Sequence, residues 1–227
     1  MAARKPDPGS SVPPISILYQ DKQLVAVDKP AGLLVIPSPK GETQTLGSLV
    51  NGFLQADSAI SGDGQAWPCH RIDRETSGIM LYARGKSMQQ EVMALFQKRL
   101  VHKSYLAIVN GIPGKAKGTI NLPIEGQESI TEYEVIGAGS DFAVVLVKPL
   151  TGRTNQIRIH FARMGHPLVG DAKFGIRKQF ARSCKRCALH AWRLELRHPA
   201  TGQLLRIEAP IPADLAGLLA EAGLASR

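Results

Sequence analysis

The stretch HRIDRETSGIML, residues 70–81, contains an aspartate that could react with a substrate. Asp73 lies between Arg71 and Arg74, and a cation close to a carboxylate favours the ionised form of that carboxylate. An ionised carboxylate can act as a nucleophile or as a base, but it cannot donate a proton. The same spacing also fits an ordinary salt-bridged loop, and Glu75 is the only acidic neighbour that could pair with Asp73.

Cys184 and Cys187 form a weaker candidate site, because a single CxxC pair is only half of a zinc site. His190 could be a third ligand, but no second pair is present and Cys69 lies far away in the sequence. Free thiols in a basic loop account better for this pattern. We therefore expect no metal, and the chain also lacks the Walker A and GxGxxG motifs of nucleotide-binding loops.

The charge balance indicates a partner rich in phosphate. The 227 residues include 28 Lys and Arg against 19 Asp and Glu, which gives a formal charge of +9. Between Asp171 and Glu195 every charged side chain is positive. Such a run is often only a solvated face, but it also suits neutralisation of a nucleic-acid backbone. We expect nucleic acid to contact Lys173, Arg177, Lys178, Arg182, Lys185 and Arg186.

The N-terminal composition and the cysteine content favour a cytoplasmic protein. Residues 1–14 lack the apolar core of a signal peptide, and no apolar run in the chain is long enough to span a bilayer. Three cysteines are an odd and small number, which fits free thiols in a reducing compartment. Residues 1–14 are rich in proline and predict a flexible tail, followed by a catalytic domain at residues 15–227.

Hydrophobic periodicity predicts the elements that must position these side chains. The loop with Asp73 follows a polar linker, and Thr76, Ser77 and Gly78 could tie that loop to its own backbone. Ser87 and Gln90 resemble a capping box at the start of a helix. We expect hairpins at 15–29 and 189–210, strands at 103–109, 130–136 and 142–150, and helices at 45–55, 88–100, 154–165 and 213–224.

Strands outnumber helices in this pattern and do not alternate regularly with them. The sequence therefore predicts an α+β fold with a mixed, mainly antiparallel central sheet flanked by helices, rather than a doubly wound parallel sheet.

Several motifs together resemble one known family, the RNA pseudouridine synthases of the ribosomal large-subunit synthase A type. HRIDRETSGIML resembles the family's HRLDxxTSG motif, and LYQDKQLVAVDKPAGLLV resembles its opening strand pair with a Lys-Pro-x-Gly turn. HKSYLAIVNG resembles the tyrosine-bearing strand, KPLTGRTNQIRIHFARMGHPLVGD the arginine-bearing motif, and LHAWRLELRHPATG the closing hairpin. The motifs occur in the family's order over residues 16–212.

The resemblance implies roles that spacing alone leaves open. Asp73 corresponds to the catalytic aspartate, Tyr105 to the tyrosine that packs on the target uracil, and Arg158 to the cation that pairs with Asp73 across a central cleft. Arg71 corresponds to the arginine that displaces the target nucleotide from its stack. Asn155 departs from the family pattern, because a histidine usually follows Gly-Arg-Thr. We also expect the N-terminal S4 domain of several relatives to be absent, because only residues 1–14 precede the first expected strand.

The implied reaction converts uridine in 23S rRNA or tRNA stem-loops to pseudouridine. This isomerisation gains no atoms or electrons, so it implies no cofactor, and nothing in the sequence calls for more than a monomer. A catalytically silent RNA-binding or ribosome-assembly protein is the alternative, and a metal-dependent hydrolase is a third reading that would need metal ligands.

Overall fold

The computed structural model describes residues 15–37, 42, 44–56, 65–175 and 184–224. The predicted tail at 1–14 and three of the predicted nucleic-acid contacts, Arg177, Lys178 and Arg182, lie outside the described residues.

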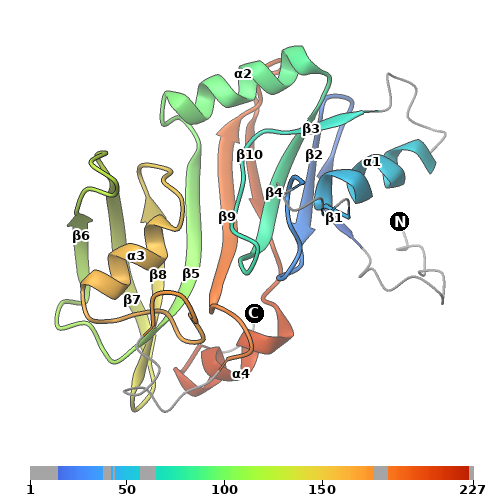
Figure 1. Cartoon of the computed structure of the whole chain (residues 1–227). Helices are drawn as coiled ribbons and strands as arrows, with labels where there is room; N and C mark the ends of the chain where they lie inside the picture. Colours follow the sequence, from blue (N-terminus) through green and yellow to red (C-terminus); the bar gives the residue numbers. More distant parts are fainter. Residues whose placement is uncertain (1–14, 38–41, 43, 57–64, 176–183, 225–227) are drawn as a thin grey trace.

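A ten-stranded sheet is the framework of the described chain (Figure 1). Its main path follows the order β1-β2-β4-β9-β5-β8-β7-β6, while β3 pairs with β4 and β10 pairs with β9. The strands are β1 (Ser16–Gln20), β2 (Leu24–Lys29), β3 (Ala66–Pro68), β4 (Ser77–Arg84), β5 (His102–Asn110), β6 (Lys117–Asn121), β7 (Ile130–Ala138), β8 (Phe142–Pro149), β9 (Leu189–Arg197) and β10 (Leu204–Glu208).

Four helices flank this sheet: α1 (Leu46–Ala56), α2 (Lys86–Gln97), α3 (Gln156–Arg163) and α4 (Ala213–Glu221). In Figure 1, α2 lies across the upper end of the sheet and α4 lies at its lower end. The expected α+β class, with a mixed and mainly antiparallel sheet flanked by helices, is confirmed.

Burial on both faces explains why the central strands are continuously apolar. In β2, Leu24 and Ala26 pack in a cluster with Met88 and Val92 of α2. The alternate residues Val25 and Val27 pack in another cluster with Leu46 and Val50 of α1. Because successive side chains of a strand point to opposite faces, α1 and α2 cover opposite faces of β2.

Two short strands, β3 and β6, and the start of α2 differ from the sequence prediction. Ser87 and Gln90 do not form the expected capping box: α2 begins at Lys86, after an N-cap at Gly85 with φ 88° and no side-chain capping bond. The strands β3 and β6 were not predicted, because β3 has three residues and β6 buries only Ile120.

A glycine is required where β4 meets β9 in the middle of the sheet. Among the described strands, the pairs are antiparallel except β4 with β9, which pairs only Ser77 with His190 and Gly78 with Ala191. Gly78 has φ +109°, and a Cβ at this position would lie 2.2 Å from the Ala191 carbonyl oxygen. Only a residue without a side chain allows this approach of the two backbones. The TSG motif therefore closes the sheet at the end of the Asp73 loop.

We predict that Gly78→Ala lowers the free energy of unfolding by at least about 3 kcal/mol, because both φ and the Ala191 backbone oppose a Cβ. Gly52→Ala in α1 is the matched control, since a Cβ at Gly52 meets no atom within 4 Å. We expect the control to change stability by less than about 1 kcal/mol, in the stabilising direction. Urea unfolding measures both, and equal midpoints for the two variants would contradict the analysis.

Candidate active site

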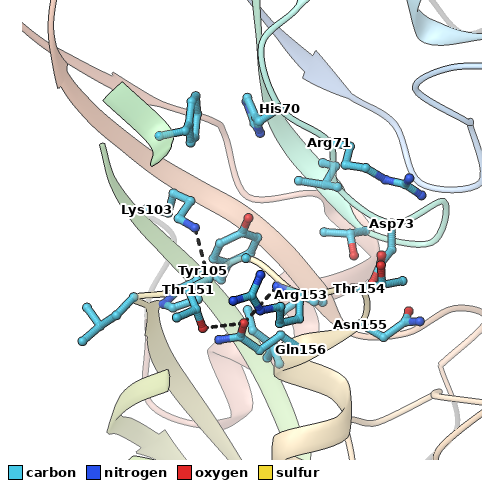
Figure 2. Close-up of a pocket in the computed structure, with 18 of the residues that line it drawn as sticks. His70, Arg71, Asp73, Lys103, Tyr105, Thr151, Arg153, Thr154, Asn155 and Gln156 are labelled. Atoms are coloured by element: carbon cyan, nitrogen blue, oxygen red, sulfur yellow. Dashed lines mark hydrogen bonds between the residues drawn. The ribbon is translucent and has the colours of Figure 1, made fainter. Parts of the chain in front are cut away.

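A pocket of about 510 Å³ brings together the three side chains that the sequence analysis singled out for catalysis. Asp73 comes from the loop between β3 and β4, Tyr105 from β5 and Arg158 from α3. Arg71 also lines the pocket and is exposed. Figure 2 shows Tyr105 in the middle of the pocket and Asp73 to one side of it.

The loop at residues 70–76 is anchored through an apolar residue. Ile72 is buried in the cluster under α1, while its neighbours Arg71 and Asp73 point away from that core. The Thr76 amide donates to the Asp73 carbonyl over 3.1 Å, which closes a turn at the aspartate. Burial of Ile72 therefore directs Asp73 toward the pocket.

A buried lysine clamps the same loop to the Lys-Pro-x-Gly turn. Lys29 is 0% exposed, and its ammonium donates to the carbonyls of Pro30, Leu33 and Arg74 at 2.8–2.9 Å. Burial lowers the pKa of Lys29 to about 7, and three carbonyl acceptors match the three N–H groups of the ammonium form. Arg74 completes the clamp, because its Nε donates to the Gly32 carbonyl over 2.9 Å.

Arg186 also binds the backbone of this loop, and its burial does not fit the predicted contact with nucleic acid. The side chain is 7% exposed, and its guanidinium binds both carboxylate oxygens of Asp214 at 2.6 and 3.0 Å. It also donates to the carbonyls of Glu75, Cys187 and Leu189 at 3.0–3.3 Å. These partners occupy the guanidinium inside the fold.

Ser77 bonds to a distant side chain and not to its own loop. A hydrogen bond of 2.9 Å joins Ser77 Oγ to His190 Nδ1. Burial lowers the pKa of His190 to about 4, so the imidazole is neutral at pH 7. The expectation that the Ser77 hydroxyl ties the loop to its own backbone is therefore wrong: it joins β4 to β9.

Arg158 lies between two carboxylates. Its Nε and Nη2 donate to the two oxygens of Asp171 at 2.7 and 2.8 Å, and its Nη1 lies 3.7 Å from Asp73 Oδ2. Nη1 also donates to Asn155 Oδ1 over 2.7 Å. The close bidentate partner of Arg158 is thus Asp171, and the contact with Asp73 expected from the resemblance is longer.

Asn155 suits the backbone at the start of α3. It has φ 55°, in the left-handed region that asparagine tolerates better than most residues. Gln156 fixes the preceding loop, because its side-chain oxygen Oε1 accepts hydrogen bonds from Thr151 Oγ1 and from the Arg153 backbone amide at 2.7 and 3.0 Å. Asn155, which stands where the family usually has histidine, therefore both begins the helix and orients Arg158.

Opposing effects act on the ionisation of Asp73. Burial raises the pKa of its carboxyl, whereas Arg158 and then Arg71 lower it, and the net pKa is raised above the usual value. The sequence indicated that nearby arginines favour the ionised form of Asp73, but it did not show that burial has the larger and opposite effect on the pKa. For Asp171 the hydrogen bonds from Arg158 and the backbone outweigh burial, so its pKa is lowered.

Tyr105 is half-buried beside this pair. Burial raises the pKa of its phenol, and the nearby Asp73 raises it further, so the side chain is neutral at pH 7. Tyr105 also packs against the clusters on either side of β5.

Two more of the predicted contacts with nucleic acid lie among the described residues. Lys173 and Lys185 are exposed, as a role in binding nucleic acid requires.

Cys187 is buried, with its thiol 3.8 Å from Asp171 Oδ2, and burial raises the pKa of this thiol. Among the described residues, no group of three or more His, Cys, Asp or Glu could hold a metal ion. No described helix has the length and apolar character needed to cross a membrane.

The sequence analysis missed several residues that shape this site. Lys29 and Asp171 stood within quoted motifs, DKPAG and HPLVGD, but nothing in their spacing showed a link to Asp73. Gln156 and Lys103, which also line or support the pocket, gave no signal because isolated polar residues in strands and helices are usually solvated.

Solved structures share this arrangement of strands and helices. The structure of Human RNA Pseudouridylate Synthase Domain Containing 4 matches with a TM-score of 0.77 and 25% identity, covering 92% of this chain and 93% of that chain. The fold is thus the pseudouridine synthase fold.

Sequence comparisons agree with the fold. A family model described as RNA pseudouridylate synthase matches residues 23–163. The Uncharacterized RNA pseudouridine synthase YlyB of Bacillus subtilis is 35% identical over 222 residues, covering 90% of this chain and 72% of the relative. Ribosomal large subunit pseudouridine synthase D of Xylella fastidiosa is 36% identical over 232 residues, covering 91% and 69%. The chain belongs to the RNA pseudouridylate synthase family, and it is an isomerase that acts on RNA.

We predict that Lys29→Met lowers the free energy of unfolding by at least about 2 kcal/mol, because three carbonyls beside the Asp73 loop lose their donor. Lys22→Met in the exposed turn between β1 and β2 is the control, and we expect it to stay within about 0.5 kcal/mol of the wild type. Urea unfolding followed by circular dichroism measures both. A Lys29→Met midpoint equal to that of the control would show that the clamp contributes nothing.

Proposed function

We propose that Asp73 is the catalytic carboxylate, that Tyr105 stacks on the target uracil, and that Arg158 orients Asp73 and favours its ionised form. The single observation that carries this proposal is the convergence of these side chains from three separate segments in one pocket. Their motifs resemble those of the ribosomal large-subunit synthase A type, to which we assign this chain. The catalytic domain in this proposal spans residues 15–227 and acts as a cytoplasmic monomer.

The proposed substrate is a uridine in a stem-loop of 23S rRNA, of tRNA, or of both. Two observations support a structured RNA of this kind: the formal charge of +9 and the name of the Xylella fastidiosa relative, which specifies the ribosomal large subunit. A uridine within folded RNA must leave its stack before it enters the pocket. In this proposal the exposed Arg71 fills the vacated space, and Lys173 and Lys185 contact the backbone.

The reaction needs an ionised carboxylate and a surface that lets the base turn. The N1–C1′ bond breaks, the uracil rotates, and a C5–C1′ bond forms, with no net change in atoms or electrons and no cofactor. Addition of Asp73 to the nucleotide and removal of a ribose proton by Asp73 both require the unprotonated form. Stacking on Tyr105 holds the detached base without fixing its in-plane orientation.

A catalytically silent RNA-binding or ribosome-assembly protein is the competing assignment. The retention of Asp73, Tyr105 and Arg158 in one pocket argues against it, because binding RNA alone does not call for a half-buried carboxylate held near an arginine.

We predict that Asp73→Asn lowers the rate of pseudouridine formation by at least about a hundredfold while RNA binding is retained. The assay follows tritium release from unmodified 23S rRNA and tRNA transcripts labelled at uracil C5, because the C5 proton leaves during the reaction. Filter binding of the same transcripts reports affinity.

Glu75→Gln is the matched control, since it removes the neighbouring carboxylate and leaves Asp73 in place. We expect its rate to stay close to that of the wild type. Wild-type rates in Asp73→Asn would overturn the assigned mechanism, whereas wild-type protein that binds RNA without releasing tritium would favour the silent RNA-binding protein.

A further inference from the structure

Lys103 is a cation in the pocket to which neither the sequence analysis nor the proposed mechanism gives a role. It lies on β5, two residues before Tyr105, and lines the same pocket. In Figure 2 its ammonium points into the region between Thr151 and Tyr105, on the other side of Tyr105 from Asp73. The side chain is half-buried.

The ammonium of Lys103 is poorly satisfied within the described part of the chain. Among the described residues, the ammonium donates one hydrogen bond, a long one of 3.4 Å to the Thr151 carbonyl, and no carboxylate lies within 4.0 Å of it. Burial lowers the pKa of Lys103, and no neighbouring group offsets this cost. A half-buried charge without an ionic partner is costly, and such groups cluster at functional sites.

The other buried cations around the Asp73 loop show the contrast. Arg158 has two bonds to Asp171, Arg186 has two bonds to Asp214, and Lys29 has three short bonds to carbonyls. Each of these groups is satisfied by the fold itself. The ammonium of Lys103 keeps N–H groups for a ligand.

His70, which feels the charge of Lys103, is not an ionic partner for it. His70 Nε2 accepts a hydrogen bond of 3.0 Å from the Leu81 amide, so the neutral imidazole carries its proton on Nδ1. Burial first and Lys103 second lower the pKa of His70 to about 3. His70 is therefore neutral at pH 7, and the charge of Lys103 stays uncompensated.

We propose that Lys103 is a substrate-binding residue. Its ammonium pairs with a negatively charged oxygen of the RNA, on the side of Tyr105 that faces away from Asp73. This inference rests on the proposed function, because the RNA supplies the anion. Two oxygens of the substrate have the required chemistry. One belongs to a backbone phosphate next to the target uridine, and the other belongs to the uracil itself after it is detached.

The second source follows from the electron balance of the reaction. When the N1–C1′ bond breaks, its electron pair stays on the base, and the negative charge spreads over N1 and the two carbonyl oxygens. The pair returns to C1′ when C5 forms the new bond, after which C5 loses a proton and N1 gains one. A cation beside Tyr105 would stabilise this transient anion.

The test compares Lys103→Gln and Lys103→Met with Lys115→Gln on unmodified 23S rRNA and tRNA transcripts. Lys115 is an exposed lysine beyond the other end of β5, and it has no assigned role. Loss of one charge-assisted hydrogen bond should reduce kcat/KM by about tenfold to a hundredfold in both Lys103 variants and by less than about twofold in the control. Thermal melting of all variants accompanies the kinetics.

Two further readouts identify which oxygen is bound. If Lys103 binds a phosphate, KM rises and the slope of log affinity against log salt concentration falls by about one. If it stabilises the detached base, the single-turnover rate falls and the salt slope is unchanged.

Wild-type kinetics in both Lys103 variants would overturn this inference, and so would unfolding of both variants at the assay temperature, which would assign Lys103 to the fold. Either result with an active wild type leaves the proposed function intact. A wild-type protein that forms no pseudouridine in these RNAs would instead overturn the proposed function and, with it, the role of Lys103.

Discussion

The site depends on one arginine held between two carboxylates. Arg158 binds Asp171 through two short hydrogen bonds, and this rigid pair places the remaining guanidinium nitrogen 3.7 Å from Asp73. Burial opposes the ionised form of Asp73, and Arg158 is the first of the groups that favour it. Asp171 accepts hydrogen bonds from Nε and Nη2, and Asn155 accepts one from Nη1, so other partners hold Arg158 in place while it influences Asp73. A longer contact also leaves the Asp73 carboxylate accessible to a substrate.

The remaining contacts serve to hold a short loop in one position. Lys29 and Arg186 bind backbone carbonyls of that loop, at Arg74 and Glu75 respectively. Ile72 anchors it in the core, and Gly78 lets β4 approach β9 at its end. Buried cations that bind carbonyls fix the backbone while the Asp73 side chain stays free to react. A loop restrained in this way loses little conformational freedom when substrate binds, which is the benefit of preorganisation.

Periodicity in the sequence was sufficient for the fold class and for most elements, because the central strands are apolar on both faces and the helices are amphipathic. It failed for β6, whose side chains are mostly exposed, and for the start of α2, where Gly85 replaces a side-chain cap. Resemblance to known motifs selected Asp73, Tyr105 and Arg158, which the structure brings into one pocket. Arg186 was assigned to the nucleic-acid contacts because a run of positive charge does not reveal which member is buried. Asp171 was missed because an ion pair between distant residues leaves no local pattern.

The central claim is that Arg158 favours the ionised form of the half-buried Asp73 carboxylate against the effect of burial. Its most direct test is the pH dependence of single-turnover pseudouridine formation in the wild type and in Arg158→Met. The rate should fall as the pH decreases and Asp73 is protonated. Since Arg158 lowers the pKa of Asp73, its loss should move this acidic limb to higher pH. An acidic limb at the same pH in both proteins would contradict the account.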